Sequence, residues 1–405
     1  MPARTKPVTH LGPGSEPVGY HQLHPDPGIN FQCNRFLQWI GPAALAEIGS
    51  AARAAGSYAD WVTAFEGLAT RARAGERGLA AAYYDRAAEF FLPPGDPRRG
   101  PARARFLDGI RSAYDLWPVP VRYDGATLPA YDLAPPGKAL GTVVMTGGFD
   151  EYVEEGFPAL TALAQAGYRV IAFDGPGQGG ALEDSGLPLT AAWERPVGAV
   201  LDHFGLDDVT LIGVSLGGGL AIRAAAFEPR VRRVIALDVL DDFLECLGRQ
   251  AGPGATAALR VALGARARPL VNLAASVAAA RKPLAAWGIR QGMHVTAART
   301  AYDFFLAAGA LTTRSVSARV TADVLLLAGA ADHYVPRHQL YRQARALTQA
   351  RSVTTRLFTA AEQAHNHCQI GNMGAALRTG LAWLQSLEPA RWAPPPGPGA
   401  PDRAE

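Results

Sequence analysis

The stretch Gly213-Val214-Ser215-Leu216-Gly217 decides the fold. The apolar run Val209–Val214 before it predicts a buried strand, and the pattern of residues 217–227 after it predicts a helix. A serine between two glycines at such a junction is typical of a nucleophile elbow, in which a sharp turn exposes the serine hydroxyl. The glycines are needed because a Cβ atom would collide in so tight a turn. We therefore predict that Ser215 is a catalytic nucleophile.

Short apolar runs alternate with helical patterns on both sides of this stretch. Eight runs rich in Val, Ile and Leu predict strands at Val119–Tyr123, 128–133, 142–147, 169–174, Val209–Val214, 231–238, 324–328 and 354–358. Helical patterns lie between them at 158–166, 190–203, 217–227, 337–347 and 375–387. The alternation predicts an α/β fold whose sheet is mostly parallel after an initial hairpin.

The remaining segments are helical or irregular. Three- and four-residue apolar spacing predicts helices before residue 118, and an Ala-rich stretch between the sixth and seventh strands is too long for an ordinary connection. The predicted division is a flexible N-terminal arm (1–28), a helical N-terminal segment that contributes to a lid (29–117), an α/β core (118–240 and 320–388), an inserted helical cap (241–319) and a disordered Pro-rich tail (389–405).

Composition excludes several classes of protein. The 405 residues are 48% hydrophobic and 19% charged, as in a globular chain, and the net charge of +3 is too balanced for a nucleic-acid footprint. The uncharged apolar run 209–222 is shorter than the ~20 residues that a membrane span needs. The three cysteines lack CxxC spacing, which disfavours a disulfide framework or a zinc site. We expect a reduced, cytoplasmic protein that acts on a small molecule, with neither nucleic acid nor membrane as a partner.

A serine nucleophile needs a base, and the base needs an orienting acid. Asp332 follows the seventh predicted strand, at the end where α/β sheets place their chemistry, although an aspartate there also suits a helix N-cap. The base should follow the acid along the chain. His365 and His367 both do, and their spacing alone does not choose between them. No third ligand with metal-site spacing accompanies this pair, so we predict no metal and no cofactor.

The oxyanion that forms during acyl transfer needs two backbone N–H donors. One is expected from Leu216, directly after the nucleophile. The other should lie in the glycine-rich loop 146–150 after the third strand, where we favour Phe149 over Gly148.

The stretch 175–180 matches GxGxxG, the fingerprint of dinucleotide-binding sites. Residues 182–188 contain Gly and Pro and do not predict the helix that a pyrophosphate needs, so nucleotide binding is disfavoured.

Together, the elbow, the late acid and the late histidine resemble the α/β-hydrolase superfamily over about residues 118–387. A narrower resemblance is to the subgroup with 2,6-dihydroxypseudooxynicotine hydrolase and fungal hydrolases that shorten polyketides. The motifs that carry it are 83–92, 173–179, 187–197 and 367–369. The subgroup's histidine lies in a Glu-Gly-Ala-x-x-His-Cys-Gln pattern. The matching residues are Glu362, Ala364, His367, Cys368 and Gln369, while Gln363 replaces the glycine. The resemblance thus selects His367 over His365.

The resemblance implies a Ser-Asp-His hydrolase of secondary metabolism that cleaves a C–C bond next to a ketone, in a β-diketone or a polyketide-like or aromatic substrate. The same triad would serve a carboxylester, thioester or amide hydrolase, and a lyase, a cyclase or a non-catalytic binder can share the fold. Relatives also suggest a homodimer. In some of them an extra carboxylate after the sixth strand assists. Asp238, Asp241 and Asp242 are available here, and we favour strand-end and helix-cap roles for them.

Overall fold

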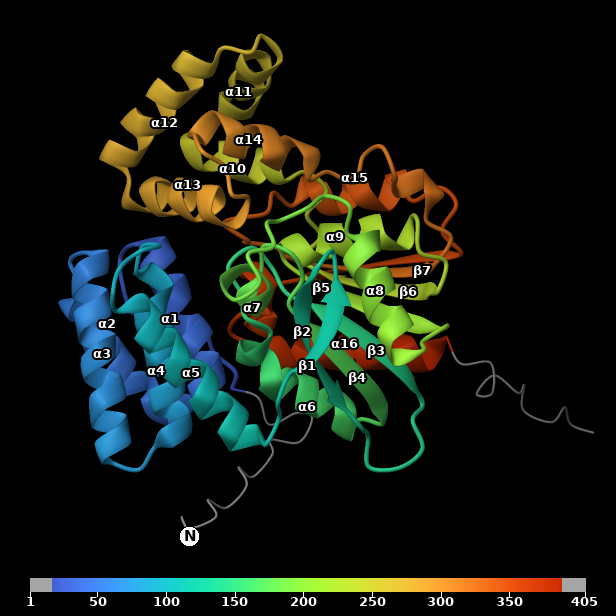
Figure 1. Cartoon of the computed structure of the whole chain (residues 1–405), viewed down its shortest axis with the longest axis horizontal. Helices are drawn as coiled ribbons and strands as arrows, with labels where there is room; N and C mark the ends of the chain where they lie inside the picture. Colours follow the sequence, from blue (N-terminus) through green and yellow to red (C-terminus); the bar gives the residue numbers. More distant parts are fainter. Residues whose placement is uncertain (1–16, 388–405) are drawn as a thin grey trace, which may run out of the picture.

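The structure is a computed structural model that describes residues 17–387 (Figure 1). The predicted tail and most of the predicted N-terminal arm lie outside these residues. Within the described part of the chain, none of the helices has the length and hydropathy needed to cross a membrane.

One sheet of eight strands forms the centre, in the order β1-β2-β4-β3-β5-β6-β7-β8. The strands are β1 Val119–Tyr123, β2 Ala126–Leu133, β3 Gly141–Thr146, β4 Tyr168–Phe173, β5 Val209–Val214, β6 Val231–Leu237, β7 Asp323–Gly329 and β8 Ser352–Phe358. β2 pairs antiparallel with β1 and β4, and every other neighbouring pair is parallel. The predicted α/β fold, mostly parallel after a hairpin, is therefore confirmed.

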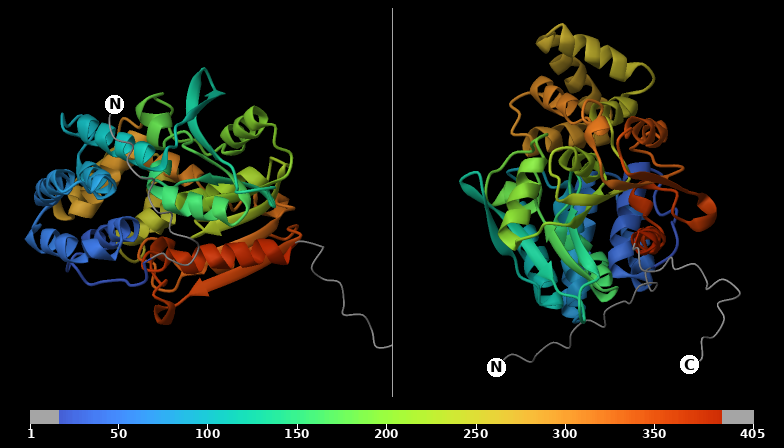
Figure 2. Two further views of the ribbon diagram at one scale, coloured as in Figure 1. Left: turned by 90° about the horizontal axis from the view of Figure 1, so that it is seen from below. Right: turned by 90° about the vertical axis from the view of Figure 1, so that its right-hand side faces the viewer.

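Helices cover both faces of the sheet, which is why β5 and β7 are buried at every residue rather than at alternate ones (Figure 2). On one face, α6 Phe157–Gln165 and α16 Met373–Ser386 pack in the same apolar cluster as Ile212. On the other face, α8 Glu194–Phe204, α9 Leu216–Ala225 and α15 His338–Ala346 pack with Leu211. Because neighbouring residues of a strand point to opposite faces, β5 contributes to both clusters.

Helices also precede the sheet and interrupt it, as predicted. The N-terminal helices are α1 Pro27–Ile40, α2 Leu45–Ala54, α3 Tyr58–Ala74, α4 Gly78–Phe91 and α5 Arg99–Tyr114, and most of their buried apolar side chains form a separate cluster. The helices inserted between β6 and β7 are α10 Phe243–Ala251, α11 Ala255–Gly264, α12 Arg268–Arg281, α13 Pro283–Val295 and α14 Ala301–Ala310. The remaining short helices are Pro42–Ala44, Val153–Gly156, α7 Gly179–Glu183, Ser317–Arg319, Ala360–Glu362 and His367–Gln369. The two helical segments meet where Trp287 stacks on Phe90 at 4.9 Å.

The glycine-rich stretch 175–180 differs in one respect from expectation, because the five-residue helix α7 begins inside it. Its glycines have packing reasons. A Cβ atom on Gly175 would lie 2.3 Å from the ring of Trp193. Gly177 has φ +81°, and a Cβ there would lie 2.5 Å from that of Leu189. Close packing between neighbouring segments therefore accounts for these two glycines of the motif.

A buried carboxylate joins the N-terminal helices to the sheet domain. Glu155 is fully buried, and it accepts from Arg35 of α1 (2.8 Å) and from Arg86 of α4 (2.7 Å). Burial opposes ionisation of Glu155, but the two guanidinium groups outweigh it and lower its pKa. Its stabilising effect is therefore complete above the pKa of the unfolded chain and is lost as the pH falls through the lower folded value.

We expect Glu155→Ala to lower the free energy of unfolding by about 3–5 kcal/mol, because it removes the buried carboxylate that two guanidinium groups share and leaves Arg35 only Asp150 and Arg86 only Glu89 as a paired carboxylate. Urea unfolding at neutral pH measures this change. Asp202→Ala is the matched control, since Asp202 pairs with Arg230 at 2.6 Å but its side chain is 72% exposed. The control should cost less than about 1 kcal/mol, and equal effects of both variants would contradict the prediction.

Candidate active site

Ser215 lies on the sharp turn between β5 and α9. Its backbone has φ 56° and ψ −119°, a conformation that residues other than glycine rarely adopt. A Cβ atom on Gly213 would lie 1.9 Å from the carbonyl oxygen of Gly217, and one on Gly217 would lie 2.5 Å from that of Gly147. The two glycines therefore allow the tight turn that the sequence predicts, and the turn holds Ser215 above the end of β5.

The structure brings Ser215 together with one of the two candidate histidines and with Asp332. His367 Nε2 lies 2.8 Å from Ser215 Oγ, and His367 Nδ1 lies 2.6 Å from Asp332 Oδ2. Asp332 follows β7, and its other oxygen accepts the N–H groups of Tyr334 and Val335, which fixes the carboxylate. His365 packs its ring against Tyr20 instead, at 6.1 Å. This arrangement permits proton transfer from the serine hydroxyl to the imidazole.

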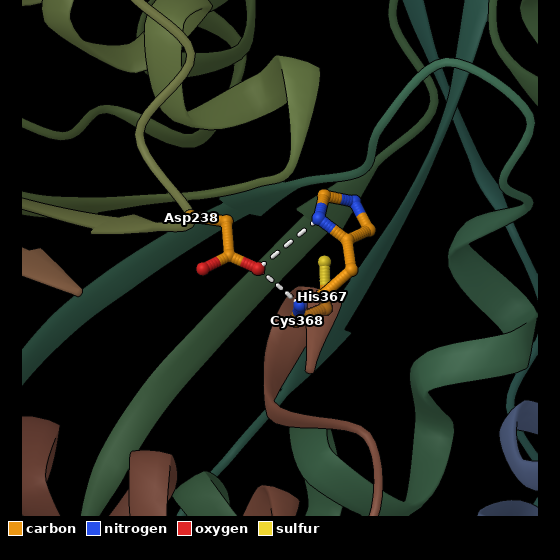
Figure 3. Close-up of side chains that lie close together, drawn as sticks. All are labelled: Asp238, His367 and Cys368. Carbon is orange, nitrogen blue, oxygen red and sulfur yellow. Dashed lines mark hydrogen bonds and ion pairs between the residues drawn. The ribbon is translucent and has the colours of Figure 1, made fainter. Parts of the chain in front are cut away.

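A second carboxylate reaches the same imidazole. Asp238 directly follows β6, and its Oδ2 lies 3.2 Å from His367 Nδ1 (Figure 3). Asp238 also accepts the backbone N–H of Cys368 and, at 3.0 Å, the side-chain amide of Gln369. It therefore does more than end a strand, contrary to the role that we favoured from sequence.

The other two aspartates lie apart from the imidazole. Asp242 caps α10 by accepting the N–H of Glu245 at 3.1 Å, so the predicted cap is confirmed there. Asp241 pairs with Arg342. The strand order could have singled out Asp238. β6, which Asp238 follows, lies between β5, which leads to Ser215, and β7, which leads to Asp332. Parallel neighbours bring their carboxyl ends to one edge of a sheet.

Burial and the close carboxylates shift the pKa values of this cluster. Burial opposes the charged form of His367, but Asp332 and Asp238 outweigh it, and the pKa of His367 rises well above its usual value. Burial and the nearby Asp332 raise the pKa of Asp238. Asp238, His367 and Cys368 offer ligand atoms within 4.8 Å of one another. However, both oxygens of Asp238 already accept hydrogen bonds, and burial raises the pKa of the Cys368 thiol to about 12. In this arrangement the Asp238 carboxylate orients the imidazole of His367 and favours its protonated form.

The loop after β3 lies against the nucleophile. A Cβ atom on Gly148 would lie 3.1 Å from that of Ser215, so the loop backbone passes close to the hydroxyl. The N–H of Gly148 donates to Glu151 Oε2 at 3.0 Å, which leaves Phe149 as the other predicted donor of this loop. Leu216 is the first residue of α9, where a backbone N–H has no acceptor within the helix.

Two residues that sequence reasoning missed hold this loop. Gln178 is buried, and its side-chain amide donates to the carbonyl oxygens of Gly147 (2.6 Å) and Gly148 (3.1 Å). Glu151 holds the Gly148 N–H from the other side. Burial raises the pKa of Glu151 to about 7, although Arg35 opposes the shift. Gln178 lies within the glycine-rich stretch, and its contacts join two loops that are about thirty residues apart.

Segments from outside the sheet enclose the site. Phe31 of α1 packs 5.9 Å from the ring of His367 and 5.6 Å from that of Tyr334, while Phe149 packs 5.1 Å from Phe243 of α10. The end of α10 is also tied to the loop of the acid, because Arg249 donates to the carbonyl oxygen of Asp332 at 3.1 Å. Similarly, Gln250 donates to that of His333 at 2.9 Å.

A small, open cavity adjoins this enclosure. It reaches Phe149 and is lined by residues of all three parts of the chain, among them Arg86, Arg99, Glu183, Trp287 and Gln291. Charged and aromatic side chains thus border the space next to the predicted oxyanion loop.

Residues 143–358 match the family model described as the alpha/beta hydrolase fold. The chain belongs to the α/β-hydrolase family. Several fungal hydrolases are similar to this α/β hydrolase in sequence. Hydrolase LUC6 of Fusarium sp is 35% identical, over 54% of this chain and 62% of its own length. Alpha/beta hydrolase psoB of Aspergillus fumigatus is 33% identical (58% and 63%), and 20-hydroxy-prefusarin hydrolase FUS2 of Gibberella moniliformis is 33% identical (56% and 64%).

This α/β hydrolase thus matches less than two thirds of the length of each of these relatives. Among solved structures, 2,6-dihydroxy-pseudo-oxynicotine hydrolase is similar with a TM-score of 0.60 and 21% identity, over 88% of this chain and 96% of that one. At this identity the likeness shows a shared fold. The family resemblance predicted from the motifs is confirmed by these comparisons.

Proposed function

We propose that this α/β hydrolase is a serine hydrolase that cleaves a C–C bond next to a ketone through an acyl-enzyme. The observation that carries the proposal is the hydrogen-bonded chain of Ser215, His367 and Asp332. A nucleophile, a base and an orienting acid in this order activate a hydroxyl that is otherwise unreactive.

The reaction begins when His367 Nε2 accepts the proton of Ser215 and Oγ attacks a ketone carbon. The N–H groups of Phe149 and Leu216 donate to the oxyanion of the tetrahedral intermediate. The bond to the neighbouring carbon then breaks, and its electron pair leaves as an enolate that a second carbonyl group stabilises. The imidazolium of His367 protonates this enolate. Finally, His367 deprotonates a water that attacks the acyl group on Ser215, which releases a carboxylic acid and restores the serine.

Two observations support C–C cleavage. A carbanion equivalent is a poor leaving group, so it needs a proton donor. The imidazolium of His367 is that donor, and Asp238 is a second buried carboxylate that stabilises it. In addition, the sequence relatives include a hydrolase that is named for a prefusarin, so the family context is secondary metabolism. The charged lining of the adjoining cavity suits a substrate with several oxygen functions.

The test is product analysis with a 1-aryl-1,3-diketone and, in parallel, an aryl ester of the same acid. We expect the diketone to yield the carboxylic acid and the methyl ketone in equal amounts, with Ser215→Ala as the inactive control. Turnover of the ester together with no cleavage of a range of diketones would overturn the C–C assignment and support an esterase with the same triad.

Glu151 should matter for the rate through the oxyanion loop. We expect Glu151→Ala to lower kcat by about 10–100-fold with little change in KM, because Gly148 loses the acceptor that orients the loop, and misplaced oxyanion donors cost rate of this order. Glu151→Gln keeps an acceptor and should retain activity within a few-fold. It should also remove any change in rate that follows ionisation of this group near pH 7. Steady-state kinetics across pH 5–9 measures both. Equal losses in the Gln and Ala variants would contradict this role.

A further inference from the structure

The inserted helices carry a marked charge asymmetry. Residues 251–300 contain seven Lys and Arg residues and no Asp or Glu, although the whole chain has a net charge of only +3. This segment runs from the end of α10 through α11, α12 and α13. Figure 1 shows α11 and α12 at the end of the inserted helices that lies farthest from the sheet, and the second view in Figure 2 agrees. Five of these cations lie in α11, in α12 or next to them, where Arg260 pairs with Asp242 and Arg268 with Asp303. Arg266, Arg281 and Lys282 give this end of the inserted helices its net positive charge.

The same outer helices expose apolar side chains. None of the residues of α11 is buried, and in α12 only Val271 and Ala275 are. Leu270, Leu273 and Val277 are 60%, 64% and 42% exposed. Their spacing of three and four residues places them on one face of α12, so they form a continuous apolar stripe.

Basic residues flank this stripe along the helix. Arg266 lies two residues before α12, Arg281 ends the helix and Lys282 follows it, and all three are exposed. Arg281 lies four residues after Val277, on the same face as the stripe. Val261 of α11, which is 72% exposed, extends the exposed apolar surface of the neighbouring helix. We call the exposed residues of α11 and α12, with Arg266 and Lys282, the outer cap surface.

We propose that the outer cap surface binds peripherally to an anionic lipid bilayer. An amphipathic helix with an apolar face and flanking Lys and Arg residues inserts its apolar side chains at the headgroup boundary, and anionic lipids attract its cations. The phosphate backbone of a nucleic acid would satisfy the charges but would leave the leucines in water. A second copy of this surface would bring like charges together and is disfavoured for that reason. The sequence-based expectation of no membrane partner rested on the absence of a spanning segment, which peripheral binding does not require.

Vesicle co-sedimentation tests this proposal with the full chain. We expect binding to phosphatidylcholine vesicles that contain about 30% phosphatidylglycerol, and much weaker binding to pure phosphatidylcholine. About 1 M salt, which shortens the Debye length to about 3 Å, should release most of the protein. The double variant Arg266→Gln/Arg281→Gln should bind about thirtyfold more weakly, at about one kcal/mol for each cation near the surface. The variant Leu270→Ser/Leu273→Ser/Val277→Ser should bind at least about tenfold more weakly.

Arg122→Gln and Leu140→Ser are the matched controls, because both side chains are exposed but belong to the sheet region. They should bind like the wild type, and all variants should keep the unfolding midpoint of the wild type. Failure of the wild type to bind the anionic vesicles would overturn the proposal, and so would equal losses in the control variants. A protein that binds a DNA duplex but no vesicles would assign the surface to nucleic acid instead, provided that Leu270→Ser/Leu273→Ser/Val277→Ser does not weaken the binding of DNA.

Discussion

Ser215→Ala is expected to lower kcat by about a millionfold, because removing the nucleophile of a triad abolishes the acyl-enzyme route. The substitution removes one oxygen from a side chain whose backbone conformation the turn already imposes, so the fold should persist. Intact-mass spectrometry after reaction with a fluorophosphonate provides a direct readout. A single adduct should appear on the wild type and be absent from Ser215→Ala.

The control for this experiment is Ser185→Ala. Ser185 is a partly exposed serine away from the triad that donates to the carbonyl oxygen of Thr127, and its loss should leave the adduct unchanged. An unmodified wild type that is well folded would contradict the role of Ser215, and the lyase and binding alternatives would then gain support.

The second large effect should come from Asp332→Asn, which we expect to lower kcat by about 10⁴-fold. An asparagine amide can donate to His367 Nδ1, which favours the tautomer that carries its proton on Nε2. In that tautomer the imidazole no longer accepts the proton of Ser215. Comparison of kcat for the wild type and Asp332→Asn on one substrate measures the effect.

Asp238→Asn separates the two carboxylates that reach His367. Asp238 lies farther from Nδ1 than Asp332 does (3.2 Å against 2.6 Å), so its loss should cost much less rate. Removing one negative charge should also lower the pKa of His367. Because the imidazole acts as a base when neutral, the acid limb of the pH–rate profile should move to lower pH. If Asp238→Asn costs as much as Asp332→Asn, Asp238 shares the orienting role.

Local pattern was enough to predict the sheet and two of the three residues that meet at its edge, Ser215 and Asp332. Ser215 and Asp332 directly follow or closely follow strands that are unbroken apolar runs, and such runs are recognisable because both faces of a parallel sheet are covered. The choice of His367 over His365 came from the resemblance to a family pattern and not from spacing.

The contacts that hold the site come from distant parts of the chain and leave no local signal. Phe31 packs on His367, more than three hundred residues away in sequence, and Arg35 reaches Glu155 across 120 residues. The role of Gln178 was hidden because its stretch matched a nucleotide-binding motif, whereas its amide serves the loop after β3. Such contacts depend on how the helices pack against the sheet, which periodicity does not specify.

The ties between α10 and the acid loop have a mechanical consequence. Arg249 and Gln250 hold two successive carbonyl oxygens, those of Asp332 and His333, with bonds of about 3 Å. A hydrogen bond of this length weakens steeply when its partners separate. Any displacement of α10 away from this loop therefore also loosens the anchor of the acid. The position of the inserted helices and the alignment of the proton-transfer chain are thus coupled through one helix end.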